Sequence, residues 1–145
     1  MGKYIRWANE DDAESLVTLN AKFNGSGLTE SEIKQNVSST NELIALAIMD
    51  GVPVGFACAQ YYKSFCYGDL QGEITEMYVQ EEVRRNGLGS MLLLFLEQEL
   101  QFRGVKVVKI LTGRHNESAH RAYEHANYRK KNHIAYEKQL TSARI

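Results

Sequence analysis

A short turn that combines glycines with arginines is the part of this chain best suited to chemistry. Arg84-Arg85-Asn86-Gly87-Leu88-Gly89 stands directly before Ser90–Phe102, a run with apolar residues at helical spacing. The start of a helix leaves backbone N–H groups without partners, and the helix dipole adds positive potential there. Glycines at positions 87 and 89 remove side chains that would block a phosphate, so the turn predicts an anion site.

Two common nucleotide loops do not fit this turn. The G-x-x-x-x-G-K-[ST] loop needs a lysine and a hydroxyl next to its final glycine, and Gly89 is followed by Ser90 and Met91. Of G-x-G-x-x-G, only Gly87-Leu88-Gly89 matches. Since a bare helix start also accounts for two glycines, the interpretation as an anion site needs support from the rest of the chain.

The elements that must position the turn alternate between strands and helices. Asn9 and Thr29 begin helices with side-chain caps, and Asp50-Gly51-Val52-Pro53 joins two apolar runs as a tight hairpin turn. Val105–Leu111 is apolar almost throughout, which is typical of a parallel strand covered on both faces. We expect strands over 3–8, 43–49, 54–62, 72–79, 105–111 and, as one or two strands, 128–140, with helices over 10–23, 29–37, 90–102 and 116–126. This order implies one α/β sandwich without a linker.

Length and composition agree with one domain. The chain has 145 residues, of which 43% are hydrophobic and 24% charged, so it can bury a core without a metal or disulfides. No apolar run approaches the ~18 residues of a membrane-spanning helix, and Met1–Arg6 does not resemble a signal peptide. We therefore expect a cytoplasmic protein with no membrane partner.

The cysteines and histidines do not form a metal motif. Cys58 and Cys66 are too far apart for a C-x-x-C pair, so both are expected as thiols, with Cys58 in the core. The four histidines are spaced so that no pair at i, i+4 shares a helix face. These are His115, His120, His125 and His133. No metal is expected.

Charge is unevenly distributed along the chain. Residues 1–81 carry 5 Lys and Arg against 12 Asp and Glu, whereas residues 82–145 carry 12 against 6. One interpretation is a protein with two substrates, in which the acidic half attracts a cation and the basic half an anion. The other is ordinary solvated charge that happens to be segregated.

Two blocks of residues together resemble the GCN5-related N-acetyltransferase (GNAT) family. The first is Arg84-x-x-Gly87-x-Gly89, preceded by a strand that ends Met77-Tyr78-Val79. The second is Asn116-x-x-Ala119-x-x-x-Tyr123-Glu124, closing at Asn127-Tyr128. The resemblance implies one N-acetyltransferase domain over residues 1–145 of α/β class. Its fold would be a mixed central sheet of six to seven strands, flanked by about four helices and splayed between the fourth and fifth strands.

The chain departs from the family pattern at three places. Glu81 and Glu82 occupy the region where a proline is common, and Arg85 stands where a glycine usually follows the arginine. Asn127 replaces the glycine before the final aromatic residue. Asparagine tolerates the left-handed backbone conformation better than most residues, so the exit from the helix can survive this change.

The resemblance implies acetyl-CoA as co-substrate. Backbone N–H groups from Arg84 to Ser90 would hold the diphosphate, Asn116 would meet the pantetheine amide, and Tyr123 would act as general acid toward the departing thiolate. A backbone N–H near Val79 would polarise the thioester carbonyl. The full expected set for the co-substrate is Met77, Tyr78, Val79, Arg84, Arg85, Asn86, Gly87, Leu88, Gly89, Ser90 and Asn116.

A general base is required because an amine with a pKa of ~10.4 is almost entirely protonated at neutral pH. Glu73 is the preferred candidate and Glu76 the second, although each is also compatible with an ordinary exposed or ion-paired glutamate. Three residues apart in one strand, they are expected to face opposite sides of the sheet unless a bulge intervenes. No cysteine stands beside an identifiable base, so we expect direct attack by a primary amine in a ternary complex.

The acceptor amine is left open by the sequence. Small-molecule amines, aminoglycosides, polyamines and peptides all remain, and the aromatic run Tyr61–Tyr67 is either a wall of the acceptor site or a packing cluster. The main alternative function is a non-catalytic acyl-CoA binding or sensing module. A nucleic-acid partner is not expected, because Arg121, Arg129, Lys130 and Lys131 accompany no recognition motif. The final strand, with Ile134 and Tyr136, is a candidate for pairing across a homodimer.

Overall fold

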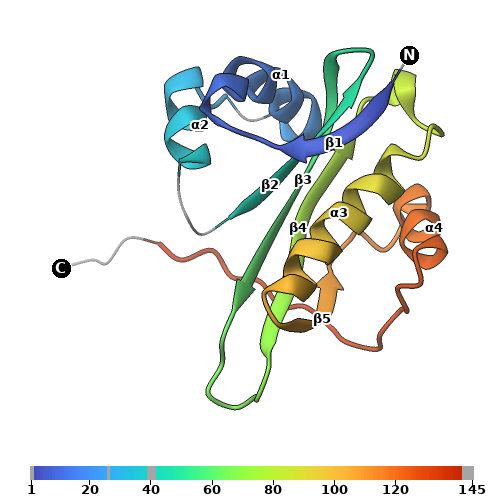
Figure 1. Ribbon diagram of the computed structural model, residues 1–145. Coiled ribbons are helices and arrows are strands. Elements are labelled where there is room, and N and C mark those ends of the chain that lie inside the picture. Colours follow the sequence, from blue (N-terminus) through green and yellow to red (C-terminus); the bar gives the residue numbers. More distant parts are fainter. Residues whose placement is uncertain (1, 26, 39–41, 142–145) are drawn as a thin grey trace.

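Five strands form one mixed sheet in the order β1-β2-β3-β4-β5. The computed structural model describes residues 2–25, 27–38 and 42–141 (Figure 1). Neighbouring strands are antiparallel except for β4 and β5, which are parallel. The strands are β1 (Lys3–Trp7), β2 (Leu43–Met49), β3 (Val52–Tyr62), β4 (Leu70–Val79) and β5 (Val105–Ile110).

The helical segments begin at the side-chain caps that the sequence predicts, except for the one that starts at Leu88. They are α1 (Ala13–Asn24), α2 (Glu30–Val37), α3 (Leu88–Phe102) and α4 (Glu117–His125), with short 3-10 turns η1 (Glu10–Asp12) and η2 (Glu81–Val83). Asn9 and Thr29 both form complete capping boxes, and the left-handed Gly25 ends α1. The hairpin between β2 and β3 is confirmed, because Asp50 and Gly51 both have positive φ (53° and 81°), as a two-residue hairpin turn requires.

The two faces of the sheet carry separate apolar cores. On one face α3 packs its buried leucines against alternate residues of the strands, including Ala57 and Ile74. On the other face Leu16, Leu19 and Ile33 of α1 and α2 pack against Phe56 and Cys58. Figure 1 shows α1 and α2 on one side of the sheet and α3 and α4 on the other. We call these the α1/α2 face and the α3/α4 face.

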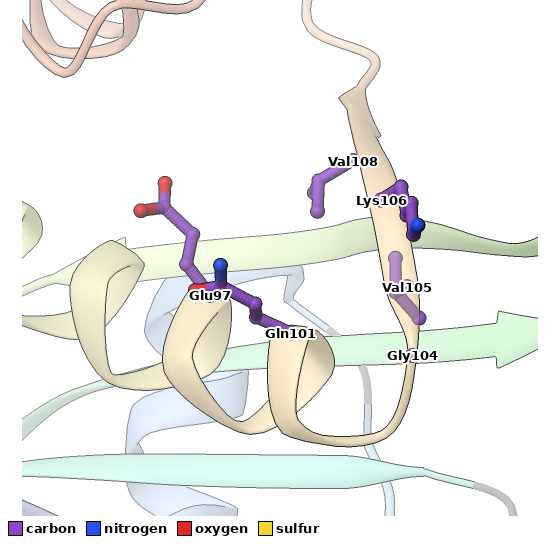
Figure 2. Close-up of a pocket in the computed structure, with 6 residues that line it drawn as sticks. All are labelled: Glu97, Gln101, Gly104, Val105, Lys106 and Val108. Carbon is purple, nitrogen blue, oxygen red and sulfur yellow. The ribbon is translucent and has the colours of Figure 1, made fainter.

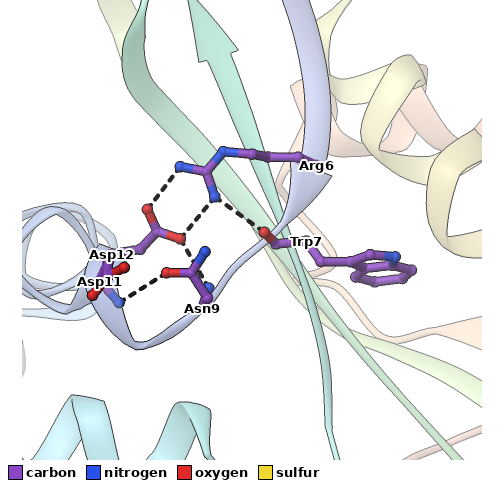
Figure 3. Close-up of polar contacts among 5 residues, drawn as sticks. All are labelled: Arg6, Trp7, Asn9, Asp11 and Asp12. Atoms are coloured by element: carbon purple, nitrogen blue, oxygen red, sulfur yellow. Dashed lines mark hydrogen bonds and ion pairs between the residues drawn. The ribbon is translucent and has the colours of Figure 1, made fainter.

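A charged contact fixes the start of α1 against β1. The Arg6 guanidinium donates two hydrogen bonds of 2.8 Å to the carboxylate of Asp12 (Figure 3). The same carboxylate accepts the backbone N–H of Asn9 at 2.8 Å, which closes the cap of η1. Asp12 is only 7% exposed, and the hydrogen bonds from Arg6 hold the pKa of its carboxyl below the usual value.

Two expectations about the C-terminal half are wrong. Residues 128–141 form no strand, so the described part of the chain has five strands rather than six or seven. Ile134 (75% exposed) and Tyr136 (92%) have a strand-like alternation, but they bury too little surface to hold a strand in place. The strand β5 is parallel to β4 as expected, yet it is not covered on both faces, since Val107 is 64% exposed.

No helix in residues 2–25, 27–38 or 42–141 is long and apolar enough to cross a membrane.

Candidate functional site

A one-residue bulge in β4 coincides with the point where β4 and β5 separate. Cys58 pairs with Glu76 and Ala59 with Ile74, so Thr75 is the extra residue of the bulge. Pairing between β4 and β5 ends at Ile74 and Ile110, whereas β4 continues to Val79. The splay expected between the fourth and fifth strands is therefore present, and one edge of β4 is open beyond Thr75.

The open edge of β4 presents backbone polar groups. The N–H of Gln80 donates to the carbonyl of Val54 at 2.9 Å, which places the backbone groups of residue 80 toward β3. Because backbone groups alternate along a strand, those of Val79 and Met77 face the open edge. An extended ligand with its own amide groups can add to such an edge as a further strand.

The turn after β4 has the backbone conformation that its sequence requires. Gly87 is left-handed (φ 79°), and so is Arg85 (φ 71°), the position where the family pattern has glycine. Arg84 is extended (φ −67°), and its Nε donates to the carbonyl of Val79 at 2.8 Å while its guanidinium lies 5.8 Å from the ring centre of Tyr78. Asn86 donates from Nδ2 to the carbonyl of Val83 at 2.8 Å, which closes the turn.

The N-terminus of α3 is open to an anion. Gly87 is its N-cap, and no side chain of the described residues caps the helix. The first helical bond runs from the N–H of Met91 to the carbonyl of Gly87 at 3.0 Å, so the N–H groups of residues 88–90 have no partner within the helix. A Cβ at Gly89 would lie 3.6 Å from Cε of Met77, so β4 passes close to this end of the helix.

Lys3 joins this turn although it lies far away in the sequence. Its Nζ donates to the carbonyl of Asn86 and lies 3.8 Å from where a Cβ on Gly87 would stand. The ammonium group of Lys3 in β1 therefore adds its positive charge to the charges of Arg84 and Arg85 at this turn. Sequence reasoning missed Lys3, because nothing in its local pattern indicates a contact across 83 positions.

Both glutamates of β4 lie on the α1/α2 face. Glu76 pairs with Cys58 and Glu73 with Gln60, and residues 58 and 60 are two apart on a regular stretch of β3. The exception that the sequence leaves open therefore applies: the bulge at Thr75 adds a residue between the two glutamates and brings both to one face. Opposite them, Met77 and Val79 belong to the core on the α3/α4 face.

A thiol and two carboxylates meet on the α1/α2 face. One ligating atom each of Glu42, Cys58 and Glu76 lie within 4.8 Å of one another, and Cys58 is buried. Burial, followed by the charge of Glu76, raises the pKa of the Glu42 carboxyl. Burial also raises the pKa of the Cys58 thiol, and the two carboxylates raise it further. The expectation that no cysteine stands beside a base is therefore wrong, although the raised pKa makes Cys58 a poor nucleophile.

This trio is the one group of three or more potential ligands found among the described residues, and no histidine belongs to it. Its two oxygen donors and one sulfur donor are a mixed set of hard and soft ligands. Cys58 would have to lose a proton before it could ligate an ion.

Tyr123 packs on the α3/α4 face, across the sheet from the trio. Its ring is one of the partly buried hydrophobic side chains that pack against the core beneath α3. Burial raises the pKa of its phenol. Tyr128 lies 6.2 Å from it between ring centres and donates its hydroxyl proton to Glu97 at 2.6 Å. Asn116 uses its side-chain oxygen to accept the N–H of Ala119 at 3.2 Å, so it serves as the N-cap of α4.

A hollow between α3 and β5 reaches Glu97, the acceptor of the Tyr128 hydroxyl. This hollow of about 400 Å³ is lined by α3 and β5 residues such as Glu97, Gln101 and Lys106, and includes no residue of the turn 84–89 (Figure 2). In the aromatic run, Phe65 is 98% exposed, while the hydroxyl of Tyr61 accepts a bond from Arg103 at 2.6 Å. The run is expected from its sequence to form either a wall of the acceptor site or a packing cluster. Tyr61 agrees with a packing cluster, and the exposed Phe65 does not.

The family model described as the Acetyltransferase (GNAT) family matches residues 3–128. The chain therefore belongs to the Acetyltransferase (GNAT) family. Among curated relatives, an aminoalkylphosphonate N-acetyltransferase of Salmonella typhimurium is 26% identical over 140 residues, which cover 94% of this chain and 90% of that protein. An uncharacterised N-acetyltransferase of Archaeoglobus fulgidus is 28% identical over 139 residues, covering 87% and 92%.

Solved structures share the fold at low sequence identity. An aminoglycoside acetyltransferase from an uncultured soil metagenomic sample, in complex with sisomicin, superimposes with a TM-score of 0.84 at 15% identity, covering 96% of this chain and 97% of that one. A ribosomal-protein-alanine N-acetyltransferase from Brucella melitensis gives 0.82 at 18% identity, covering 96% and 100%. Together with the family match, these likenesses establish the α/β acetyltransferase fold.

Proposed function

We propose that this protein transfers the acetyl group of acetyl-CoA to a primary amine by direct attack in a ternary complex. One observation carries the proposal: the open edge of β4 leads directly into an uncapped helix N-terminus surrounded by cations. Acetyl-CoA needs both parts, because its pantetheine arm carries amides and its diphosphate carries negative charge. The whole chain, residues 1–145, then acts as one acetyltransferase domain.

The co-substrate would lie along the splay. Its pantetheine amides would bond with the backbone of Met77 and the N–H of Val79, and its diphosphate would accept hydrogen bonds from N–H groups between Arg84 and Ser90. Lys3, Arg84 and Arg85 would add charge around the diphosphate. Tyr78, Asn86 and Leu88 would support this path, and Asn116 would approach it from the start of α4.

The chemistry requires a base and an acid on opposite sides of the thioester. A carboxylate of β4, Glu73 or Glu76, would take a proton from the acceptor ammonium on the α1/α2 face. The neutral amine would then attack the carbonyl carbon, held polarised by a backbone N–H of β4 near Val79. As the C–S bond breaks, Tyr123 on the α3/α4 face would donate its proton to the leaving thiolate. The raised pKa of its phenol keeps that proton in place at neutral pH.

The acceptor is proposed to be a small molecule that carries a primary amine. The relatives named above include an aminoalkylphosphonate N-acetyltransferase and an aminoglycoside acetyltransferase, so the family accommodates acceptors of this class. In this chain the α1/α2 face carries the carboxylates of Glu42, Glu73 and Glu76, which favour a positively charged group. A peptide amine remains the second acceptor class, since one structural neighbour is a ribosomal-protein-alanine N-acetyltransferase.

Thiol release tests the proposal. Wild-type protein with acetyl-CoA should release CoA thiol when an aminoglycoside, polyamine, aminoalkylphosphonate or alanine-terminated peptide is added, and mass spectrometry should find that amine 42 Da heavier, about the mass of an acetyl group replacing a proton. A Gly89→Val variant should lose calorimetric binding of CoA, since its side chain would stand among the N–H groups proposed to hold the diphosphate. Binding without thiol release for any amine would instead support a non-catalytic acyl-CoA module.

Two further expectations accompany this function. We propose that a second copy of the chain is the protein partner, with the segment around Ile134 and Tyr136 as its contact, and that the protein works in the cytoplasm. The co-substrate and an amine account for the chemistry without a nucleic-acid or membrane partner and without a metal.

A further inference from the structure

We propose that Glu42 is a positioning residue for catalysis. Its carboxyl shares one proton with the carboxyl of Glu76 beside Cys58. This sharing makes Glu76, rather than Glu73, the general base. The inference rests on the proposed acetyl transfer and deepens it. It assigns a role to a residue just before β2 that no sequence pattern indicates.

The geometry of the trio supports proton sharing. Glu42 precedes β2, Cys58 lies in β3 and Glu76 in β4, so three different strands bring these side chains together. All three ligating atoms lie within 4.8 Å of one another, with the thiol against both carboxylates. Two carboxylates this close repel each other when both are charged, and this repulsion adds to the effect of burial in raising the pKa of Glu42.

The surroundings of Glu42 leave Glu76 as its charged neighbour. The α1 and α2 residues in the core of this face are apolar, and they include Leu16, Leu19 and Ile33. Burial, the charge of Glu76 and a hydrogen bond from Cys58 are the influences on Glu42, and the first two raise its pKa. Glu73 and Tyr78 share the face but are not among these influences.

Position along β4 favours Glu76 over Glu73. Glu73 pairs on one side with Gln60 and on the other with Lys109, so it lies where β4 still has two neighbouring strands. Glu76 follows the bulge and lies in the open part of β4, beside Met77. Since the thioester would occupy the open part, Glu76 is the carboxylate next to the reacting carbonyl. Thr75 fixes its orientation by donating its hydroxyl proton to Oε1 of Glu76 at 2.7 Å.

The proposed step balances as follows. The acceptor ammonium gives one proton to the carboxylate pair, and its nitrogen lone pair forms the C–N bond. The C–S bond breaks, the thiolate takes the phenolic proton of Tyr123, and the second nitrogen proton returns to that phenolate. The pair finally releases its shared proton to solvent. The products are the acetylated amine, CoA thiol and one proton, and Cys58 keeps its own proton throughout.

Substitution of Glu42 tests the inference in two independent ways. Glutamate side chains labelled with carbon-13 at the carboxyl carbon can be titrated by NMR in the wild type, in Glu42→Gln and in Glu137→Gln, whose target is an exposed carboxylate in the C-terminal segment. In Glu42→Gln the Glu76 signal should move to lower pH than in the wild type, because the neighbouring carboxylate that repels it is gone. Glu137→Gln should leave it unchanged. This readout needs no acceptor, so it holds even if the proposed reaction is not found.

Kinetics with an accepted amine supply the second readout. Glu76→Gln should lower kcat by about 10²-fold, and Glu42→Gln by about tenfold with the acidic limb of the kcat profile moved to lower pH. Both should keep the affinity for CoA. An unmoved Glu76 titration in Glu42→Gln would overturn the inference, and so would a larger kcat loss in Glu73→Gln than in Glu76→Gln. Loss of native circular dichroism in Glu42→Gln would show that Glu42 has a structural role instead. In that case Glu42→Asp, which keeps the charge, should also fail to restore the wild-type titration of Glu76.

Discussion

The phenol of Tyr123 is the single group whose removal tests the acid step. Changing Tyr123 to Phe should lower kcat by about 10²-fold, because the thiolate would have to leave without a proton donor. The affinity for CoA should remain, since the ring still fills its place in the core. Thiol release and calorimetry measure the two effects.

The matched control for this change is Tyr136→Phe, because Tyr136 is 92% exposed in the C-terminal segment. It should leave both quantities unchanged. A Tyr123→Phe protein with full kcat would show that solvent protonates the thiolate and that Tyr123 is only a core aromatic residue.

Asp12 makes a pH-dependent contribution to stability. Its folded pKa is lowered, chiefly by the hydrogen bonds from Arg6, below the unfolded value of about 3.9. Its stabilising effect is therefore complete above that value and is lost as pH falls through the lower folded pKa. Asp12→Asn should lower the free energy of unfolding by about 1–3 kcal/mol at pH 7, because Arg6 and the Asn9 N–H lose a charged acceptor.

Urea unfolding of both proteins from pH 7 to pH 2 measures this difference, which should shrink at the acid end. Asp11→Asn is the neighbouring control, because Asp11 is exposed, and it should change the free energy by less than about 0.5 kcal/mol. A difference between wild type and Asp12→Asn that stays constant over the whole pH range would contradict the role of the ion pair.

At the level of residues, the sequence predicts which side chains could do chemistry better than it predicts the face of the sheet on which each side chain lies. The types Arg84, Gly87 and Tyr123 identify the family pattern, but a bulge has no signature of its own. The sequence could therefore only name a bulge as the exception that would bring Glu73 and Glu76 to one face, and the structure supplies it at Thr75. The approach of Glu42 to Glu76 depends on the packing of three neighbouring strands, so no local sequence pattern predicts it either.

At the level of elements, the close approach of β3 to β4 links packing to the proposed binding edge. A Cβ at Gly55 would lie 2.7 Å from the carbonyl oxygen of Tyr78 and 3.2 Å from Cα of Val79. Gly55→Ala should therefore push the last residues of β4 outward. We expect a loss of about 1–3 kcal/mol in the free energy of unfolding and severalfold weaker CoA binding.

Gly68→Ala is the control for this change, since nothing lies within 4 Å of a Cβ at Gly68. Chemical unfolding and calorimetry compare the two variants. If Gly55→Ala lost stability but bound CoA as tightly as the wild type, the end of β4 would not be part of the binding edge.

Elements with local signals were predicted well, and those that depend on distant partners were not. The caps Asn9 and Thr29 and the turn Asp50-Gly51 define η1, α2 and the first hairpin within a few residues. Asn127 adopts the left-handed conformation (φ 73°) that its position after α4 requires, as expected. Residues 128–140 have a strand-like alternation too, but a strand also needs a neighbour, and none is supplied by the described part of this chain.

At the level of the whole molecule, the C-terminal segment and the edge of the sheet are both incompletely covered. In Figure 1 the segment after α4 leaves the helices and extends away from them. Its apolar side chains Ile134, Tyr136 and Leu140 are at least 75% exposed, and β5, the last strand of the sheet, exposes Val107. Exposed apolar side chains and an uncovered strand edge each favour association with another chain.

Removal of residues 132–145 separates the contribution of this segment to the fold from its proposed contact with a second copy. The deletion should leave the free energy of unfolding of a monomer within about 0.5 kcal/mol, because every described residue removed is exposed. Sedimentation at increasing concentration should give the full chain twice the mass expected for one copy and the shortened chain the mass of one. Equal masses for the two forms would contradict pairing through this segment, whereas a shortened chain that unfolds at much lower urea would show that residues 132–141 stabilise their own domain. Tyr136→Ser, which removes only the most exposed ring of the segment, should weaken self-association without changing the unfolding of the monomer.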